Sequence, residues 1–227
     1  MVVSCDSVGT MKKRLTLFWF ALFALALGSV AVAGIFKYRT HNPYDLQNGD
    51  IVFQDTNSSQ GKAVKAATGS RWTHVGMVFF REGKPMVIEA VQPVRITHLS
   101  RFIARSPSSF YAMRLKDSNK HINAKTIARA ESYCNKQLGK NYDLQFRWSD
   151  DKIYCSELVW KVYKEAAGIE LCKPRPFKSY NLKHPTVQRI AKQRYGSVRN
   201  LPLNELAVAP SDLAESDLLV EVPKKAK

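Results

Sequence analysis

The first pattern along the chain is a series of short apolar runs between residues 51 and 115, separated by glycine, proline and polar residues. Runs of this length, bounded by turn residues, predict β-strands. Between two of the runs, Glu82 and Gly83 form a two-residue turn signal, which predicts a hairpin. The predicted strands cover residues 51–53, 74–80, 85–91, 94–97 and 110–115.

A second pattern, with apolar residues three and four positions apart, predicts helices on both sides of these strands. The clearest helix covers residues 154–167 and ends at Gly168, which favours a C-terminal cap. Strands flanked by helices, without regular alternation of the two, indicate an α+β fold with an antiparallel sheet. The other predicted helices cover residues 62–68, 99–104 and 122–137.

A third pattern is the stretch of 22 uncharged residues at positions 15–36, which follows Lys12, Lys13 and Arg14. Its length and position predict either a cleaved signal peptide or a single transmembrane anchor. The small residues at positions 31–33 fit cleavage before Gly34. With the positive charges on the cytoplasmic side, the rest of the chain is expected to be exported, periplasmic or membrane-anchored on the non-cytoplasmic side.

These patterns divide the chain into three parts. Residues 1–36 are the predicted signal peptide or anchor, residues 37–200 a single folded domain, and residues 201–227 a peripheral C-terminal tail. The sequence leaves the oligomeric state open.

The composition bears on the charge of a binding partner. Of 227 residues, 45% are hydrophobic, which is typical of a globular protein, and the net charge is +16. Such a charge fits a solvated basic surface, or one that meets an anionic membrane or cell-wall polymer. Residues 173–199 hold eight lysines and arginines and no acidic residue, and the same two interpretations apply there. No nucleic-acid-binding motif is present, so no nucleic acid partner is expected.

The four cysteines are Cys5, Cys134, Cys155 and Cys172. Cys5 precedes the apolar segment and lies outside the domain. Either Cys134 pairs with Cys172 and leaves Cys155 free, or all three are thiols. No cysteine or histidine has the spacing of a zinc site, and no nucleotide-binding glycine motif occurs, so neither a metal nor another cofactor is expected.

Cys155 is the candidate nucleophile. It falls in the first turn of the predicted helix, where free backbone N–H groups and the helix dipole favour a thiolate. Taken alone, a buried structural cysteine is an equally good interpretation of this position. His74, at the head of a predicted strand, is a separate imidazole that can act as its base. Gly76, two residues later, leaves room for a close approach.

Glu89 is the candidate third member. If Glu82 and Gly83 form the hairpin turn, Glu89 lies diagonally across from His74 on the same face of the sheet, where it can orient the imidazole. Gln54 is a possible oxyanion donor, together with the backbone N–H of Cys155. Tyr154 either lines the site or only packs.

Four segments in order resemble the YiiX-like permuted papain-like amidases of the NlpC-type cysteine peptidase superfamily. They are residues 48–54, 73–78, 87–91 and 154–159, and the resemblance extends over residues 46–168. It implies a circularly permuted papain-like fold, with a small antiparallel β-barrel-like sheet packed against helices. It also implies Cys155 as nucleophile, His74 as base and Glu89 as polar third residue.

Three functions follow as hypotheses. The first is a cysteine hydrolase that cleaves a peptide or N-acyl amide of the cell envelope through an acyl-thioester. The second is a lipid-directed acyltransferase or hydrolase that uses the same two residues. The third is a catalytically silent, membrane-tethered binding module in which Cys155 only packs.

Overall fold

The computed structural model describes residues 42–226. The predicted signal peptide or anchor therefore lies outside the described residues. The α-helices of the described part are α2 (Ser59–Thr68), α3 (Leu99–Ala104), α4 (Ser118–His121), α5 (Ala124–Gln137), α6 (Cys155–Ala167), α7 (Pro185–Tyr195) and α8 (Pro210–Ala214). The strands are β1 (Ile51–Gln54), β2 (His74–Arg81), β3 (Lys84–Glu89), β4 (Arg95–His98), β5 (Tyr111–Leu115), β6 (Arg175–Pro176), β7 (Leu206–Ala207) and β8 (Leu219–Glu221). Short 3₁₀ turns cover Pro107–Ser109, Phe177–Ser179 and Val198–Asn200.

A six-stranded antiparallel sheet forms the centre of this part of the chain, in the order β4-β3-β2-β1-β5-β8. The predicted hairpin is confirmed, because Arg81 pairs with Lys84 across a turn in which Glu82 and Gly83 both have positive φ. The remaining strands, β6 and β7, form a separate small pair. The predicted α+β class with an antiparallel sheet is thus confirmed.

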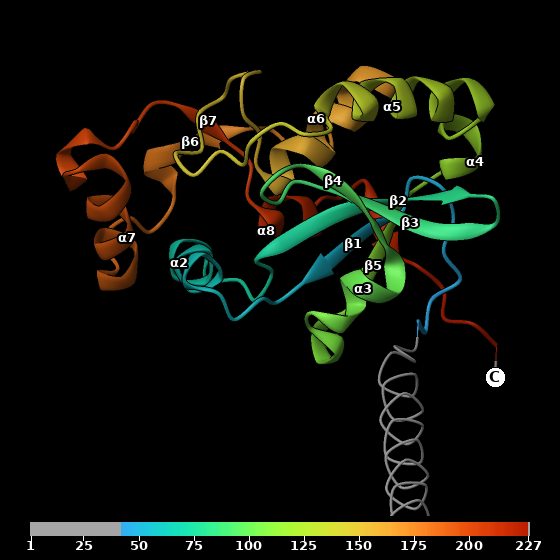
Figure 1. The fold of residues 1–227 in the computed structure, drawn as a ribbon, viewed down its shortest axis with the longest axis horizontal. Coiled ribbons are helices and arrows are strands. Elements are labelled where there is room, and N and C mark those ends of the chain that lie inside the picture. Colours follow the sequence, from blue (N-terminus) through green and yellow to red (C-terminus); the bar gives the residue numbers. More distant parts are fainter. Residues whose placement is uncertain (1–41, 227) are drawn as a thin grey trace, which may run out of the picture. The chain divides into compact units, whose positions relative to one another are not determined.

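Both faces of the sheet are covered (Figure 1). Alternation along β1 sends Ile51 and Phe53 into the larger core, which includes the apolar face of α6, and Val52 into a smaller core beneath α3. Helix α5 packs against α6 and forms an outer layer on that side. The site residues described below come from the start of β2, the end of β3 and the start of α6.

The interpretation of residues 201–227 as a peripheral tail is wrong. Strand β8 pairs with β5 and becomes an edge of the central sheet, and Leu213, Leu219 and Val222 are buried in the two cores. The sequence pattern concealed this, because β8 is only three residues long and shows no regular alternation of apolar and polar residues.

The basic segment 173–199 also contains more structure than the charge pattern indicated. Pro185 begins α7 after His184, whose Nδ1 accepts a hydrogen bond from the Thr186 backbone at 3.2 Å. Val187, Ile190 and Ala191 are buried on one face of α7, while Arg189 and Lys192 are exposed. Helix α7 packs against α2 on the left-hand side of Figure 1.

Among residues 42–226, no helix combines the length and the apolar character that crossing a membrane requires.

Candidate active site

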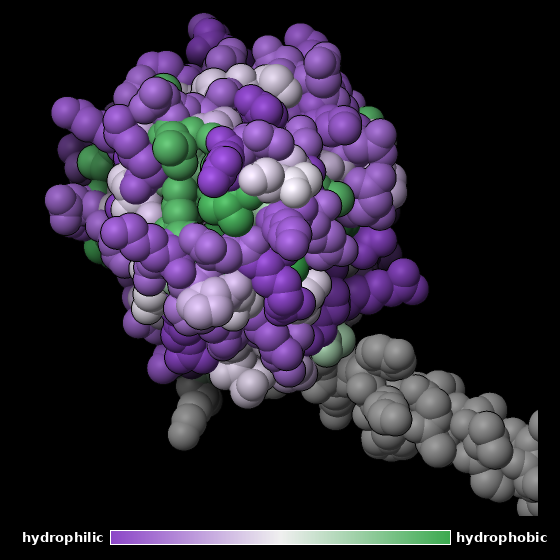
Figure 2. Space-filling view, turned by 90° about the vertical axis from the view of Figure 1, so that its left-hand side faces the viewer, coloured by the Kyte–Doolittle hydropathy of each residue, from purple (hydrophilic) through white to green (hydrophobic). Residues whose placement is uncertain are grey.

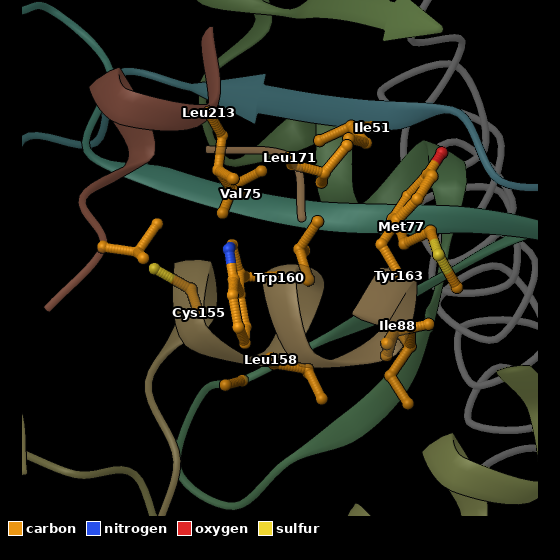
Figure 3. Packing of buried hydrophobic residues seen from close by; sticks show 14 of the residues in the cluster. Ile51, Val75, Met77, Ile88, Cys155, Leu158, Trp160, Tyr163, Leu171 and Leu213 are labelled. Carbon is orange, nitrogen blue, oxygen red and sulfur yellow. The ribbon is translucent and has the colours of Figure 1, made fainter. Parts of the chain in front are cut away.

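Cys155 is the first residue of α6 (Figure 3). Tyr154 is the N-cap of this helix. The cap is closed by Glu157, whose Oε2 accepts from the Tyr154 backbone N–H at 3.4 Å. Because first-turn N–H groups have no partner within their helix, the sulfur lies at the positive end of the α6 dipole. The backbone N–H of Val75 on β2 also donates to the sulfur. The helix start and the strand together place the thiol.

His74 begins β2 and forms a hydrogen bond with the Cys155 thiol. Its Nε2 lies 2.7 Å from Oε2 of Glu89, which leaves Nδ1 as the ring nitrogen for the sulfur. The imidazole also stacks on Phe102 of α3, with the ring centroids 5.7 Å apart. The structure thus brings together the three predicted residues Cys155, His74 and Glu89, from three separate elements.

Gly76 makes the approach of Glu89 possible. The hairpin register pairs Met77 with Ile88, so Gly76 comes opposite Glu89. A Cβ at Gly76 would stand 2.5 Å from a Val87 methyl and 2.8 Å from the Ile88 carbonyl oxygen. Only a glycine fits here, and its absent side chain leaves β3 close enough for Glu89 to reach along the sheet to His74.

Glu89 is completely buried and is held on several sides. Arg105, directly after α3, donates to both carboxylate oxygens, with Nη1 2.9 Å from Oε1. Thr97 of β4 donates to Oε1 at 2.6 Å. A buried carboxylate is stable only when paired in this way, so Arg105 and Thr97 fix the group that in turn fixes His74.

These contacts favour the charged forms of all three groups. Burial raises the pKa of Glu89, but hydrogen bonds from His74 and Arg105 outweigh it and lower that pKa to about 2. Burial opposes an imidazolium at His74, yet its hydrogen bonds to Cys155 and Glu89 raise the pKa of the ring to about 9. Burial likewise raises the pKa of the Cys155 thiol, but the hydrogen bond and charge of His74 lower it overall. The arrangement therefore supports a thiolate–imidazolium pair.

Tyr142 is a fourth group at the sulfur, and no sequence pattern marks it. Its hydroxyl donates toward Cys155 Sγ at 3.9 Å, at the long end of the range for sulfur. Gln60 of α2 donates to the same hydroxyl oxygen at 2.5 Å. Tyr142 lies outside the helices and strands, in a stretch without apolar periodicity, and only its isolated bridge to Ile153 places it beside α6. A hydroxyl here can stabilise negative charge on the sulfur or on a nearby oxygen.

A pocket opens directly beside Cys155. It encloses about 800 Å³, including the part open to solvent, and its walls are almost entirely apolar. Figure 2 shows this side of the molecule, where hydrophobic side chains are visible in a hollow surrounded by hydrophilic ones. Although Cys155 is only 3% exposed, its position in the pocket wall gives a ligand access to it. The lining includes Val64, Phe177, Leu182, Val187, Ile190 and Leu201.

The remaining predicted site residues have different surroundings. Gln54 pairs with His74 across β1 and β2, but its amide donates to the Phe102 carbonyl at 2.6 Å and is not directed to the thiol. The expectation of a Gln54 oxyanion donor is not met by this geometry. Tyr154 is buried and lines the pocket, and its hydroxyl accepts from the Val208 backbone at 3.2 Å.

The other cysteines of the described residues differ from Cys155. Cys134 and Cys172 are both free, so the pairing considered from the sequence is not formed. Burial raises the pKa of each of these two thiols to about 12. Between residues 42 and 226, no group of three or more histidine, cysteine or acidic side chains has an arrangement that could hold a metal ion.

Comparisons with known proteins agree with this fold. Residues 45–222 match the model of a family described as permuted papain-like amidase enzymes, YaeF/YiiX, C92 family. An uncharacterized protein of Escherichia coli K12, YiiX, is 39% identical over 179 residues, which cover 79% of this chain and 87% of the relative. A crystal structure described as metalloprotein YiiX from Escherichia coli O157:H7 superposes with a TM-score of 0.73 at 38% identity, over 80% of this chain and 99% of that one.

Proposed function

The chain belongs to the C92 family of permuted papain-like amidases, and on that premise we propose that it is a cysteine-dependent amidase acting through an acyl-thioester on Cys155. One observation carries the proposal. Cys155 begins α6 and its thiol forms a hydrogen bond with the ring of His74, whose other ring nitrogen is held 2.7 Å from Glu89. A nucleophile, a base and a group that orients the base are the three parts that this chemistry needs.

In the proposed first step, the Cys155 thiolate attacks an amide carbonyl carbon, and the carbonyl π electrons move onto oxygen. When that oxyanion collapses, the C–N bond breaks and the His74 imidazolium gives its proton to the leaving nitrogen. In the second step, neutral His74 takes a proton from water, which attacks the thioester. A carboxylic acid leaves, and the thiolate–imidazolium pair is restored.

The oxyanion of both steps needs hydrogen-bond donors. The Tyr142 hydroxyl and the first-turn backbone N–H of Cys155 are available beside the sulfur. They replace the donor that the sequence assigned to Gln54.

Trapping of the acyl group tests the proposal. We expect p-nitrophenyl butanoate, an activated ester probe, to acylate the protein with a burst of p-nitrophenol, and mass spectrometry to place the butanoyl group on Cys155. Cys155→Ala should abolish the burst. Cys172 is a partly exposed free thiol, and Cys172→Ala should retain the burst. An equal burst from Cys155→Ala would contradict the proposal.

Alkylation gives a test that needs no substrate. Iodoacetamide at pH 6 should modify Cys155 at least tenfold faster than Cys134 or Cys172, because only the Cys155 pKa is lowered. Equally slow labelling of the three cysteines would remove the basis for a thiolate nucleophile.

The apolar pocket favours a second candidate, a lipid-directed hydrolase or acyltransferase that uses the same residues. An acyl chain can bind in a pocket with apolar walls without leaving polar groups unpaired. With p-nitrophenyl dodecanoate instead of the butanoate, the acylation rate should rise at least tenfold, and Ile190→Trp should remove this preference. Arg189→Trp, an exposed change on the same helix, is the matched control. A lack of preference for chain length would favour the short-chain amidase.

The Escherichia coli structure is described as that of a metalloprotein, but the site around Cys155 in this chain does not suit a metal ion. The Glu89 carboxylate already accepts hydrogen bonds from Arg105 and Thr97. Both ring nitrogens of His74 also have hydrogen-bond partners. The donors present here therefore do not fit a metal, and no step uses one.

We further propose that the domain works outside the cytoplasm, at the cell envelope, because residues 15–36 form an uncharged stretch after three basic residues. The net charge of +16 suits an anionic membrane or cell-wall surface. An alkaline phosphatase fusion at the C terminus should be active in a bacterial host, and deletion of residues 15–36 should silence it. An inactive fusion of the full chain would contradict export.

A further inference from the structure

The hydroxyl of Tyr142 has one hydrogen to donate, and the direction of that hydrogen decides whether the residue can serve the sulfur. If Tyr142 donated to Gln60, its oxygen would face Cys155 as an acceptor and would oppose a thiolate. If Gln60 donates to Tyr142, the hydroxyl hydrogen is free for the sulfur or for an oxyanion. The outcome depends on which end of the Gln60 amide faces Tyr142.

Arg194, in the last turn of α7, determines that orientation. Its Nη2 donates to Oε1 of Gln60 at 2.9 Å. A guanidinium has only donors, so it can face only the oxygen of the Gln60 amide. The NH₂ group of Gln60 must then point to Tyr142, whose oxygen it reaches at 2.5 Å. The assignment follows from donor and acceptor chemistry alone.

Both ends of this chain of hydrogen bonds are fixed in place. Nη1 of Arg194 donates to the Leu144 carbonyl at 3.0 Å, and the guanidinium lies 5.7 Å from the centre of the Phe146 ring. Gln60 is in the first turn of α2, which Ser58 caps, and a Cβ on the neighbouring Gly61 would overlap the Thr56 carbonyl oxygen. Helices α2 and α7 pack against each other. The amide therefore has little freedom to turn over.

We propose that Gln60 and Arg194 are positioning residues, which hold the Tyr142 hydroxyl so that its hydrogen is donated to the Cys155 sulfur in the resting site and to the oxyanion once that forms. This inference rests on the proposed function and deepens it. Helix α7 would then supply both the apolar wall of the pocket and, through Arg194, the polarity of a donor at the reaction centre.

The pH profile of Cys155 alkylation by iodoacetamide tests the proposal, because a purely structural role would not move it. In Gln60→Glu, the carboxylate only accepts, so Tyr142 turns its hydrogen away from the sulfur. A hydrogen bond to a charged group is worth about one pKa unit or more, so alkylation at pH 6 should slow about tenfold. Tyr142→Phe, which deletes the hydroxyl, should slow it similarly. Gln188→Glu, an exposed change on α7, is the control for added charge and should leave the rate unchanged.

The double variant Gln60→Glu/Tyr142→Phe should be no slower than Gln60→Glu, because both changes remove the same hydrogen bond. Additive losses would show that Gln60 does not set the direction and would overturn the proposal, as would a Gln60→Glu rate equal to that of Gln188→Glu. If Gln60→Glu does not fold, Gln60→Met decides instead. It leaves the hydroxyl undirected and should slow alkylation about threefold, and an unchanged rate would overturn the proposal.

Arg194 is tested in the same assay. Arg194→Met should shift the profile to higher pH, Arg194→Lys should restore it, and Arg189→Met on the exposed side of α7 should have no effect. An unshifted Arg194→Met profile would overturn the role of Arg194. Alkylation needs no acyl transfer, so failure of this proposal and failure of the amidase proposal are distinguishable. A shifted pH profile without acylation of Cys155 contradicts only the amidase proposal. Acylation of Cys155 without a shifted profile contradicts only the positioning role of Gln60 and Arg194.

Discussion

Glu89 is, after Cys155, the second residue whose hydrogen bond favours a charged His74. Its carboxylate lies 2.7 Å from His74 Nε2, and the exposed surface of the residue is zero. In Glu89→Gln the neutral amide no longer stabilises an imidazolium. The pKa of His74, raised to about 9 in the wild type, should therefore fall by at least one unit.

A titration of the imidazole resonances by NMR measures this shift, and the exposed His98 and His184 of the same spectra are internal controls. Iodoacetamide should also label Cys155 more slowly at pH 6 in this variant. An unchanged His74 titration would mean that Glu89 plays no part in charging the site.

The residue scale also shows what local sequence can say about a site. The residues Cys155 and His74 were identifiable because each stands at the boundary of a strongly patterned element. Glu89 was identifiable because an apolar strand with one carboxylate needs a partner for it. Arg105 and Tyr142 carry no such mark, since an arginine after a short helix and a tyrosine in a loop are ordinary on a basic surface.

At the scale of elements, β8 and the residue after it show that the C-terminal segment is part of the fold. Val222 is 1% exposed and packs in the core beneath α3, whereas Val220, two positions earlier, is 43% exposed. Val222→Ala should lower the free energy of unfolding by about 2 kcal/mol through lost burial and the remaining cavity. Val220→Ala, the matched control, should change it by less than about 0.5 kcal/mol.

Urea denaturation followed by tryptophan fluorescence measures both variants. Equal and small effects would restore the original interpretation of residues 201–227 as a tail that contributes nothing to the core.

Helix α7 is the second element whose meaning depended on its neighbours. In sequence, its charged residues dominate and suggest surface. In the fold, three apolar residues on one side of the helix close the pocket beside Cys155. The spacing of Val187, Ile190 and Ala191 is a helical signal, but it is too short to outweigh the charges around it.

At the scale of the whole molecule, the buried Glu89 carboxylate makes the free energy of unfolding depend on pH. Its pKa is lowered to about 2 from an ordinary value of 4.5. Because the pKa is lower in the folded state, the ionised Glu89 stabilises that state fully when the pH is above the pKa of the unfolded chain. This stabilisation is lost as the pH falls from about 4.5 toward 2. The shift corresponds to about 3 kcal/mol.

The comparison of wild type with Glu89→Gln isolates this contribution, since all other carboxylates titrate in both. The stability difference between the two, measured by urea unfolding at pH 5 and at pH 2, should shrink by about 3 kcal/mol at the lower pH. A difference that is independent of pH would mean that Glu89 is not ionised in the folded state.

Local sequence patterns were enough to predict the elements whose hydrophobic period is strong and the residues at their ends. Five strands, four helices, the hairpin register and the order of histidine before cysteine follow from local patterns, because burial on one face repeats every two or every 3.6 residues. The same patterns identified Cys155, His74 and Glu89.

The surroundings of those residues depend instead on how distant elements pack together. Arg105 reaches Glu89 across 16 positions, and Arg194 reaches Gln60 across 134. Hydrogen bonds between such distant residues leave no period in the sequence, because they depend on how the elements pack and not on the residues beside them in the chain. The edge strand β8, the pocket wall of α7 and the direction of the Tyr142 hydroxyl all arise in this way.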